Sequence, residues 1–513
     1  MHSCETTRQA KLTSSHSWTA TCAIILLFIP TAIAAPAQTF TTLADFPFHI
    51  DGGGVGLIQG TDGDFYGITT DGGATNSECT PFGSCGTIFK VTPTGTLTIL
   101  HAFCSTTPCT GGWFPNWLIR GGDGNFYGTT AFGGANHPNT CSSGCGTMFK
   151  ITPTGTFTTL YNFCALAGCA DGGAPGSFVQ AFAGGVFGDV YGSTLNGGAF
   201  GHGTIFSITP KGQLTVLHNS CAQANCSDGF GSGPLTQDVG GNFYGVAPTG
   251  SGEKSCNNGW CDLIFRMTPA GTVTVLHSFP GPILLNADLV KGTDGLFYGT
   301  TQVSGKRVAN LCFAQGCGTI FKVSAGGEYS TIYDFCSQAS CADGSLPEVG
   351  LIQATDGNFY GSTGSGGGPN YGTLFMITSS GVFTSLHSFC QTDCADGSSP
   401  QQRLVQGTDG RFYGITQGGG INLHGTIFSL DMGLAPFVTF LISTGPVGTK
   451  VGILGQGFTG TTAVSFNGTP ATFTTKSDTY VTAVVPAGAT TGSVTVTTPS
   501  GTLTSNVAYR VTQ

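Results

Sequence analysis

Cysteine is the residue type whose spacing points most directly to chemistry in this chain. Apart from Cys4 and Cys22, the 20 cysteines fall in nine close pairs. The pairs are Cys79-Cys85, Cys104-Cys109, Cys141-Cys145, Cys164-Cys169, Cys221-Cys226, Cys256-Cys261, Cys312-Cys317, Cys336-Cys341 and Cys390-Cys394. A segment that lacks one member of a pair also lacks the other, which predicts that the two are bonded. Metal binding is the alternative, but even, locally paired cysteines favour disulfides, so we expect nine disulfides and no metal.

Acidic side chains offer little basis for catalysis. A polysaccharide hydrolase or lyase needs two carboxylates, or a base with a charge stabiliser, in one pocket. The glutamates after residue 37 are Glu78, Glu253, Glu328 and Glu348. Aspartates recur in Asp-Gly turns, at Asp62, Asp123, Asp294, Asp356 and Asp409. Asp238, Glu253 and Glu348 depart from the pattern, but no nucleophile elbow, metal-ligand spacing or phosphate loop accompanies them. We therefore expect no catalytic residue and no cofactor.

Tryptophan and arginine supply the candidate ligand-binding residues. Trp113, Trp117 and Trp260 interrupt the repeated pattern described below, in or beside long connections. Flat aromatic faces can stack on sugar rings, although these three side chains could instead fill interfaces between repeats. Arg120 and Lys291 stand where other repeats have Gln, at a position expected to line a central channel. The candidate ligand-binding residues are Trp113, Trp117, Arg120 and Trp260.

Three motifs, each present seven times, must position these residues. The first, DGNFYG and its variants, has its tyrosine at Tyr66, Tyr127, Tyr191, Tyr244, Tyr298, Tyr360 and Tyr413. The second, GTIF, ends at Phe89, Phe149, Phe206, Phe265, Phe321, Phe375 and Phe428. The third, TLTxLHxF, begins at Thr39, Thr96, Thr156, Gln213, Thr272, Glu328 and Val382. Such self-similarity is typical of repeat architectures.

Each repeat is predicted to form four short strands joined by tight turns. In the first repeat they cover 57–61, 64–70, 86–92 and 96–103, with Asp-Gly and Pro-Thr-Gly as turn signals. Apolar residues on both faces of each strand suit a blade packed between two others. The first TLT-type strand, Thr39 to Phe46, has no repeat of its own, and the last repeat ends at Phe428 without one. Their pairing would close a seven-bladed β-propeller, whereas an open β-solenoid is the alternative.

The repeated histidines are interpreted as packing residues. His101, His218, His277 and His387 share a strand position with Tyr161 and Tyr333. In contrast, the long connections vary in length and carry all the cysteine pairs. Because variable loops on a rigid scaffold commonly bind ligands, we expect the disulfide-rich face to be the functional face.

The ends of the chain and its charge limit its location and partners. Arg8 and Lys11 precede an apolar run at about 20–29, which is too short to span a membrane, and small-residue cleavage sites follow. We expect residues 1–37 to be a signal peptide and the mature, membrane-span-free chain to be a secreted or cell-surface monomer. Net charge is −9 and no later Lys/Arg cluster occurs, which argues against nucleic-acid binding.

The repeats carry a family resemblance. Segments such as LIQGTDGDFYG, GTIFKVT and TLTILHAF resemble the GloVer tandem repeat of exported bacterial proteins over about residues 39–433. The resemblance implies export but no established activity. Segments after residue 434, including GPVGT, GQGF, VSFNGTPA and GSVTV, resemble an IPT/TIG domain. This resemblance implies an immunoglobulin-like β-sandwich over residues 434–513, following a propeller over 38–433.

The sequence thus predicts a non-catalytic binding protein that presents its disulfide-rich face to an extracellular glycan or surface protein. A propeller-type polysaccharide hydrolase or lyase and a purely structural surface protein are the alternatives.

Overall fold

The computed structural model describes residues 38–47, 56–79, 83–136, 141, 143–183, 186–229, 233–249, 261–279, 288–308, 312 and 316–512. The predicted signal peptide lies outside these residues. Within them, no helix reaches the length and hydrophobicity needed to cross a membrane. Short 3-10 turns occur at η1 (Ser77–Cys79), η2 (Ala167–Cys169), η3 (Ala224–Cys226) and η5 (Ala339–Cys341).

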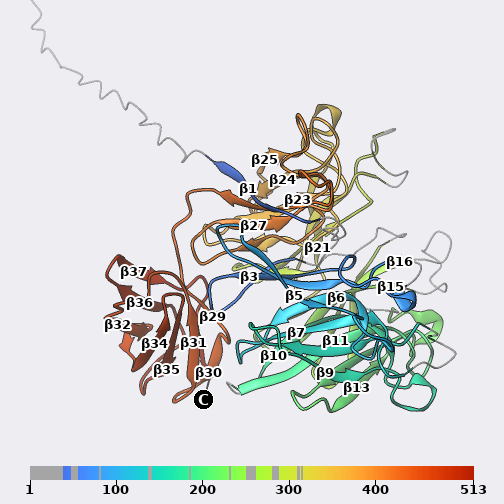
Figure 1. Ribbon diagram of the computed structural model, residues 1–513, viewed down its shortest axis with the longest axis horizontal. Coiled ribbons are helices and arrows are strands. Elements are labelled where there is room, and N and C mark those ends of the chain that lie inside the picture. Colours follow the sequence, from blue (N-terminus) through green and yellow to red (C-terminus); the bar gives the residue numbers. More distant parts are fainter. Residues whose placement is uncertain are drawn as a thin grey trace, which may run out of the picture. The chain divides into compact units, whose positions relative to one another are not determined.

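The repeats form seven four-stranded antiparallel sheets (Figure 1). Sheets 1 and 2 contain β2 (Ile58–Gln59), β3 (Phe65–Thr69), β4 (Thr87–Val91) and β5 (Leu97–Ala102), then β6 (Trp113–Arg120), β7 (Phe126–Phe132), β8 (Thr147–Ile151) and β9 (Phe157–Asn162). Sheets 3 and 4 contain β10 (Gly173–Ala183), β11 (Val186–Asn196), β12 (Thr204–Ile208) and β13 (Leu214–Asn219), then β14 (Leu235–Gln237), β15 (Phe243–Thr249), β16 (Cys261–Met267) and β17 (Val273–Ser278).

The remaining three sheets follow the same order. Sheets 5 and 6 contain β18 (Val290–Lys291), β19 (Phe297–Thr301), β20 (Thr319–Val323) and β21 (Tyr329–Asp334), then β22 (Ile352–Gln353), β23 (Phe359–Thr363), β24 (Thr373–Ile377) and β25 (Phe383–Ser388). Sheet 7 contains β26 (Val405–Gln406), β27 (Phe412–Ile415), β28 (Thr426–Asp431) and β1 (Thr39–Asp45). The chain is therefore an all-β tandem-repeat protein, as the sequence predicts.

Each motif has a structural reason within its sheet. Gly63 of the Asp-Gly turn has a φ of +87°, a left-handed conformation that favours glycine. Gly67 of the FYG motif lies under the ring of Phe89 from the GTIF motif, since a Cβ atom at Gly67 would lie 2.5 Å from that ring. The first and second motifs therefore depend on each other, and they recur together because neither packs without the other.

The N-terminal strand completes the last sheet. β1 pairs antiparallel with β28 from Thr39–Asp431 to Asp45–Thr426, and Figure 1 shows the blue N-terminal strand beside the orange C-terminal strands of the repeats. Phe46, which follows β1, is fully buried. The predicted pairing of the unassigned N-terminal strand with the incomplete last repeat is confirmed.

Aromatic stacking joins the sheets at six of the seven junctions; at the junction of sheets 2 and 3, Val190 stands in place of the phenylalanine. The tyrosine of DGNFYG stacks on the phenylalanine of the same motif in the following sheet, with ring centroids about 4 Å apart. The pairs are Tyr66–Phe126, Tyr191–Phe243, Tyr244–Phe297, Tyr298–Phe359, Tyr360–Phe412 and Tyr413–Phe65. The last pair joins sheet 7 to sheet 1. This contact opposes the open-solenoid alternative, in which the first and last repeats would not meet.

The C-terminal strands form a separate group with their own core. One sheet has the order β29 (Thr439–Phe440), β31 (Lys450–Leu454), β35 (Tyr480–Val484) and β34 (Phe473–Ser477). The other has the order β33 (Thr469–Pro470), β32 (Ala463–Phe466), β36 (Val494–Thr498) and β37 (Gly501–Thr504), while β30 (Thr444–Pro446) pairs parallel with β38 (Arg510–Thr512). Val451, Ile453, Val464, Val494 and Val496 share this core.

Eight of the predicted cysteine pairs are bonded as disulfides. The ninth, Cys256–Cys261, extends outside the described residues. Two of the disulfides lie close together, since the sulfur atoms of Cys141, Cys145, Cys164 and Cys169 are all within 4.8 Å of one another. These sulfurs are bonded in pairs and so are not thiolate ligands. Disulfides persist in oxidising compartments, which indicates a location outside the cytoplasm.

Candidate binding channel

The first strands of the sheets line two adjoining cavities. One cavity, of about 500 Å³, is lined by residues of β2, β6, β22 and β26 and by Thr439 of β29. The other, of about 390 Å³, is lined by residues of β6, β10, β14 and β18. Both lie within the size range of small-ligand sites. Together they form what we call the channel.

One position per sheet defines a ring around this channel. In each sheet, this residue lies at or near the end of the first strand and pairs with the motif phenylalanine of the second strand, or with Val190 in sheet 3. The seven residues are Gln59, Arg120, Gln180, Gln237, Lys291, Gln353 and Gln406. All seven side chains belong to residues that line one cavity or the other. The expectation that Arg120 and Lys291 occupy a channel-lining position is met.

The repeated glutamines of this ring also fasten neighbouring sheets together. The side-chain oxygen of Gln406 accepts a hydrogen bond from the Thr355 backbone N–H of the preceding sheet at 3.1 Å. Gln59 accepts the same bond from Thr408 at 3.0 Å, across the junction between sheets 1 and 7. A glutamine at this position is therefore structural, which leaves Arg120 and Lys291 as the exceptions to be explained by another role.

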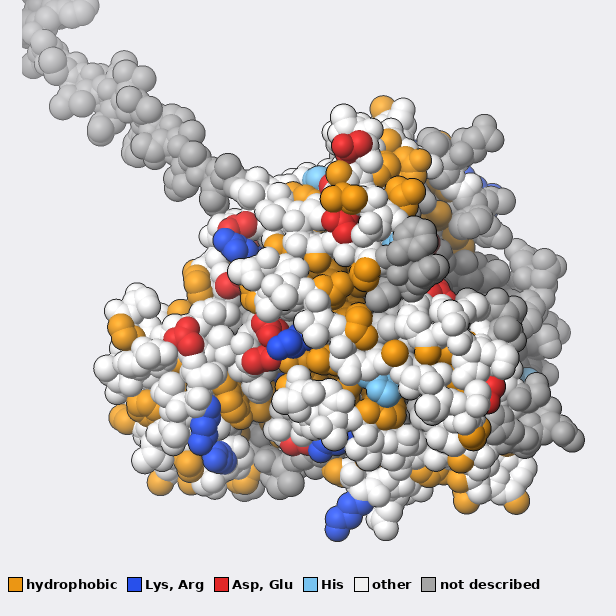
Figure 2. All heavy atoms as spheres, in the orientation of Figure 1, with side chains coloured by type: hydrophobic (Ala, Val, Ile, Leu, Met, Phe, Trp, Pro, Cys, Tyr) orange, Lys and Arg blue, Asp and Glu red, His pale blue; other side chains and the backbone are white. Residues whose placement is uncertain are grey.

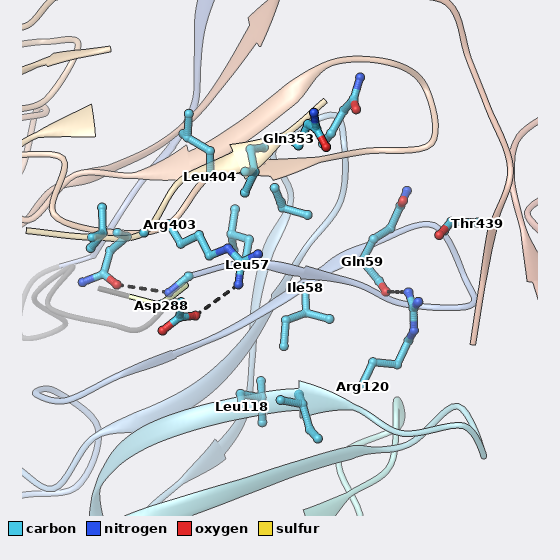
Figure 3. A pocket seen from close by; sticks show the side chains of 18 of the residues that line it. Leu57, Ile58, Gln59, Leu118, Arg120, Asp288, Gln353, Arg403, Leu404 and Thr439 are labelled. Atoms are coloured by element: carbon cyan, nitrogen blue, oxygen red, sulfur yellow. Dashed lines mark hydrogen bonds and ion pairs between the residues drawn. The ribbon is translucent and has the colours of Figure 1, made fainter. Parts of the chain in front are cut away.

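An ion pair between distant sheets marks one part of the channel. Arg403 lies 3.1 Å from the carboxylate of Asp288 (Figure 3). Burial raises the pKa of Asp288, and the positive charge of Arg403 opposes this effect. Asp288 is the single carboxylate among the described residues that line either cavity. The described lining of the channel therefore holds one carboxylate, whereas glycoside hydrolysis uses two that converge.

Trp117 and Arg120 occupy the wall between the two cavities. Trp117 is half-buried and lines both, and its indole N–H donates to the Phe178 carbonyl at 2.9 Å. The guanidinium of Arg120 donates to the carbonyls of Gln59 and Phe440 (Figure 3). Burial lowers the pKa of Arg120 to about 10, so the group is still charged at neutral pH. The structure thus brings two of the four predicted ligand-binding residues together.

Trp113 requires a correction. The sequence interpretation assigned it to ligand binding, but its side chain is only 1% exposed. It packs on Phe132 within a core that also contains Cys104 and Cys109. β6 begins at Trp113, so the residue that spacing placed in a connection belongs to a buried strand. The alternative reading, in which this tryptophan fills an interface, is the correct one. Trp260 lies outside the described residues.

Two of the unusual acidic residues are also explained. Asp238 lies two positions earlier than the Asp of the other repeats, in a turn of the same length, yet it also accepts hydrogen bonds from the motif tyrosine, Tyr244, and from the Gly240 and Asn242 backbone. Glu348 is not among the residues lining the channel, and burial raises its pKa while a hydrogen bond from Gln302 opposes this. Glu253 lies outside the described residues.

Sequence reasoning missed a set of buried aspartates in the loops after the fourth strand. Asp171 is fully buried, and it accepts hydrogen bonds from the Tyr161 hydroxyl and from the backbone N–H groups of Ala165 and Leu166. The equivalents are Asp228, Asp343 and Asp396, which accept from His218, Tyr333 and His387. The recurring Cys-(Ala/Ser)-Asp-Gly segment was the available signal. The packing interpretation of the His/Tyr position is supported by these contacts.

We expect His101, one of the two repeated histidines for which no such aspartate bond is present among the described residues, to make the fold sensitive to acid. His101 stacks on Phe157 at 4.1 Å, and burial lowers its pKa to about 4. The unfolded chain binds this proton near pH 6.5. Stability from neutral His101 is therefore complete above about pH 6.5 and is lost as the pH falls toward 4. A His101→Phe variant should lose less Tm than wild type between about pH 7 and pH 4.5.

The equivalent variant His387→Phe serves as the control. His387 pairs with Asp396 at 2.8 Å, so its removal leaves a carboxylate without that partner and should lower Tm already at pH 7. Tm–pH curves of wild type and His101→Phe that run parallel would contradict this account of His101.

The repeats place the chain in the class of all-β tandem-repeat proteins with a channel. It belongs to the Gloeobacter/Verrucomicrobia repeat family, whose model matches residues 31–188, 80–313 and 261–479. The last match ends inside the region assigned to an IPT/TIG domain, and the comparisons give no support for that assignment. No curated protein matches the chain in sequence.

Solved structures resemble the fold only remotely. A luciferin-regenerating enzyme has 11% identity and a TM-score of 0.37, covering 63% of this chain and 92% of that one. A gluconolactonase from Xanthomonas campestris has 14% identity and a TM-score of 0.32, covering 55% and 78%. A protein of unknown function from Dyadobacter fermentans has 11% identity and a TM-score of 0.38, covering 77% and 98%. Similarity at this level carries no information about activity.

Proposed function

We propose that this chain is an exported, non-catalytic binding protein that takes an extracellular glycan into its channel. In this proposal the seven sheets are the blades of a closed β-propeller, and residues 434–513 are an immunoglobulin-like accessory domain. The ligand site moves from the disulfide-rich loops, where the sequence placed it, to the channel that those loops surround.

The observation that carries the proposal is the composition of the channel. Trp117 offers an aromatic face, Thr439 and Asn506 offer polar side chains, and Leu118 and Leu404 supply apolar contact within one cavity. Sugar rings present both apolar faces and many hydroxyls, so an aromatic side chain among polar groups suits them. The visible protein surface offers less, because Figure 2 shows charged side chains as isolated spots on a mostly neutral surface.

Binding without turnover is favoured over catalysis by the state of Asp288. This carboxylate is held by Arg403, and the described cavity residues provide no second carboxylate to act as its partner. General acid–base cleavage of a glycosidic bond needs both.

A glycan array combined with a hydrolysis screen tests the proposal. We expect the secreted protein to retain at least one glycan without releasing product. Trp117→Ala should weaken retention about tenfold or more, because loss of a stacked ring removes on the order of 1.5 kcal/mol or more. The matched variant Trp117→Phe, which keeps an aromatic face, should retain most of the binding.

Two results would overturn the proposal. Product formation would identify an enzyme instead. Binding that survives in a folded Trp117→Ala protein, and also in Asp288→Asn, would move the site away from the channel.

A further inference from the structure

Two positive charges interrupt the ring of glutamines around the channel. Arg120 ends β6 and Lys291 ends β18, and both line the cavity of about 390 Å³ together with Gln180 and Gln237. The other ring positions, Gln59, Gln353 and Gln406, carry amides. Glutamine at this position fastens adjacent sheets. Arg120 keeps such a role through its bond to the Gln59 carbonyl, so what these two replacements add to the ring is positive charge.

Among the described residues, the positive charges of this cavity exceed the negative ones. Arg403 is neutralised by Asp288. Arg120 donates to two backbone carbonyls, and within the described part of the chain no carboxylate pairs with Arg120 or Lys291. Three cations and one carboxylate give the lining a net charge of 3 − 1 = +2, although the whole protein carries −9. The channel is therefore a positive interior within an acidic protein.

Buried donors in the same cavity lack acceptors. Gln180 is only 7% exposed, and its side-chain oxygen accepts from the Gly122 N–H at 3.2 Å. Its side-chain nitrogen, like the Nε of Arg120, is buried without a hydrogen-bond partner among the described residues. Lys291 lies 5.9 Å from the centroid of the Phe297 ring. The positive lining and these donors favour a ligand that accepts hydrogen bonds and carries negative charge.

We propose that Arg120, Gln180 and Lys291 bind the carboxylate of an acidic sugar. The inference rests on the proposed glycan-binding function and specifies its ligand class. A guanidinium and an ammonium are the groups that proteins use to bind carboxylates, and a buried amide N–H adds a further donor. The neighbouring Trp117, which lines the same cavity, is placed to contact the ring that bears the carboxylate.

Isothermal titration of the secreted full-length protein with three probes tests this proposal. The probes are digalacturonate, its dimethyl ester, and succinate. Digalacturonate should bind at least about tenfold more tightly than the ester, because the ester keeps the sugar shape but loses the charge. Succinate, which lacks sugar rings, should bind more weakly than digalacturonate.

Two single variants identify the residues. Arg120→Gln and Lys291→Gln introduce the residue that the ring has elsewhere, and the amide introduced by Arg120→Gln could accept from the Thr61 N–H as Gln406 accepts from Thr355. Each should therefore fold with a Tm near wild type. Each should weaken digalacturonate binding about tenfold and weaken ester binding by a clearly smaller factor.

The outcomes separate this inference from the proposed function. Equal affinity for the acid and the ester, no binding of any probe, or folded variants that bind digalacturonate like wild type would each overturn the carboxylate site. Neutral glycans bound as tightly as digalacturonate would leave the proposed function in place and remove the inference. Succinate bound as tightly as digalacturonate, with both weakened in the variants, would keep the anion site and remove the glycan.

Discussion

Deletion of β1 is expected to prevent the secreted chain from accumulating in folded form. The deletion of Thr39–Asp45 removes the outer strand of sheet 7 and leaves β28 as an unpaired edge. Ile427, Phe428 and Leu430 of that strand are fully buried in the intact protein. Phe40 also leaves its stack on His387, whose ring centroid lies 4.0 Å away. An exposed apolar edge strand favours aggregation, so we expect little soluble monomer by size-exclusion chromatography.

Rescue and substitution provide the controls. A synthetic peptide of residues 38–47, added during refolding, should restore soluble protein by occupying the vacated edge. Thr41→Ala, at an exposed position of the same strand, should change stability by no more than about 0.5 kcal/mol. A deletion variant that stays monomeric with the wild-type Tm would show that the repeats do not need this closure.

Replacement of Asp171 by alanine should cause the largest loss of stability among the single substitutions considered. The variant removes a fully buried acceptor and leaves the Tyr161 hydroxyl and two backbone N–H groups without it. At about 1 kcal/mol or more for each unpaired donor, the expected loss is roughly 3 kcal/mol. Chemical denaturation of the intact disulfide-bonded protein would measure it.

Asp356→Ala is the matched control for Asp171→Ala. Asp356 also accepts from a tyrosine hydroxyl and a backbone N–H, but it lies in an exposed Asp-Gly turn where water can replace it. Its loss should cost no more than about 1 kcal/mol. Equal losses for the two variants would contradict the importance assigned to the buried loop aspartate.

The repeat architecture was predictable because its signals are local and recur seven times. The Asp-Gly turn near Gly63 and the mutual dependence of Gly67 and Phe89 are features of one sheet, so the sequence pattern reports them directly. The closing strand could be predicted because the first copy of the third motif precedes the first repeat, whereas the last repeat ends without a copy. Disulfide partners were predictable because they are close in sequence.

The binding channel was less predictable because it joins residues that no local pattern connects. Asp288 and Arg403 are 115 residues apart and belong to connections that differ between repeats. Arg120 was identified because it replaces a repeated glutamine, whereas Trp113 was misassigned because spacing alone could not distinguish a loop from the start of β6. Asp238 was misread because it lies two positions earlier in its turn than the repeated aspartate, although its side chain accepts from the same tyrosine.

The location of the bound ligand tests the central claim most directly. An experimental structure of the secreted protein with a glycan retained in the array should show the ligand in the channel, with a sugar ring against Trp117 and polar contacts to lining residues such as Thr439 and Asn506. A ligand bound on the disulfide-rich loops or on the C-terminal strands, with the channel free of it, would contradict the account.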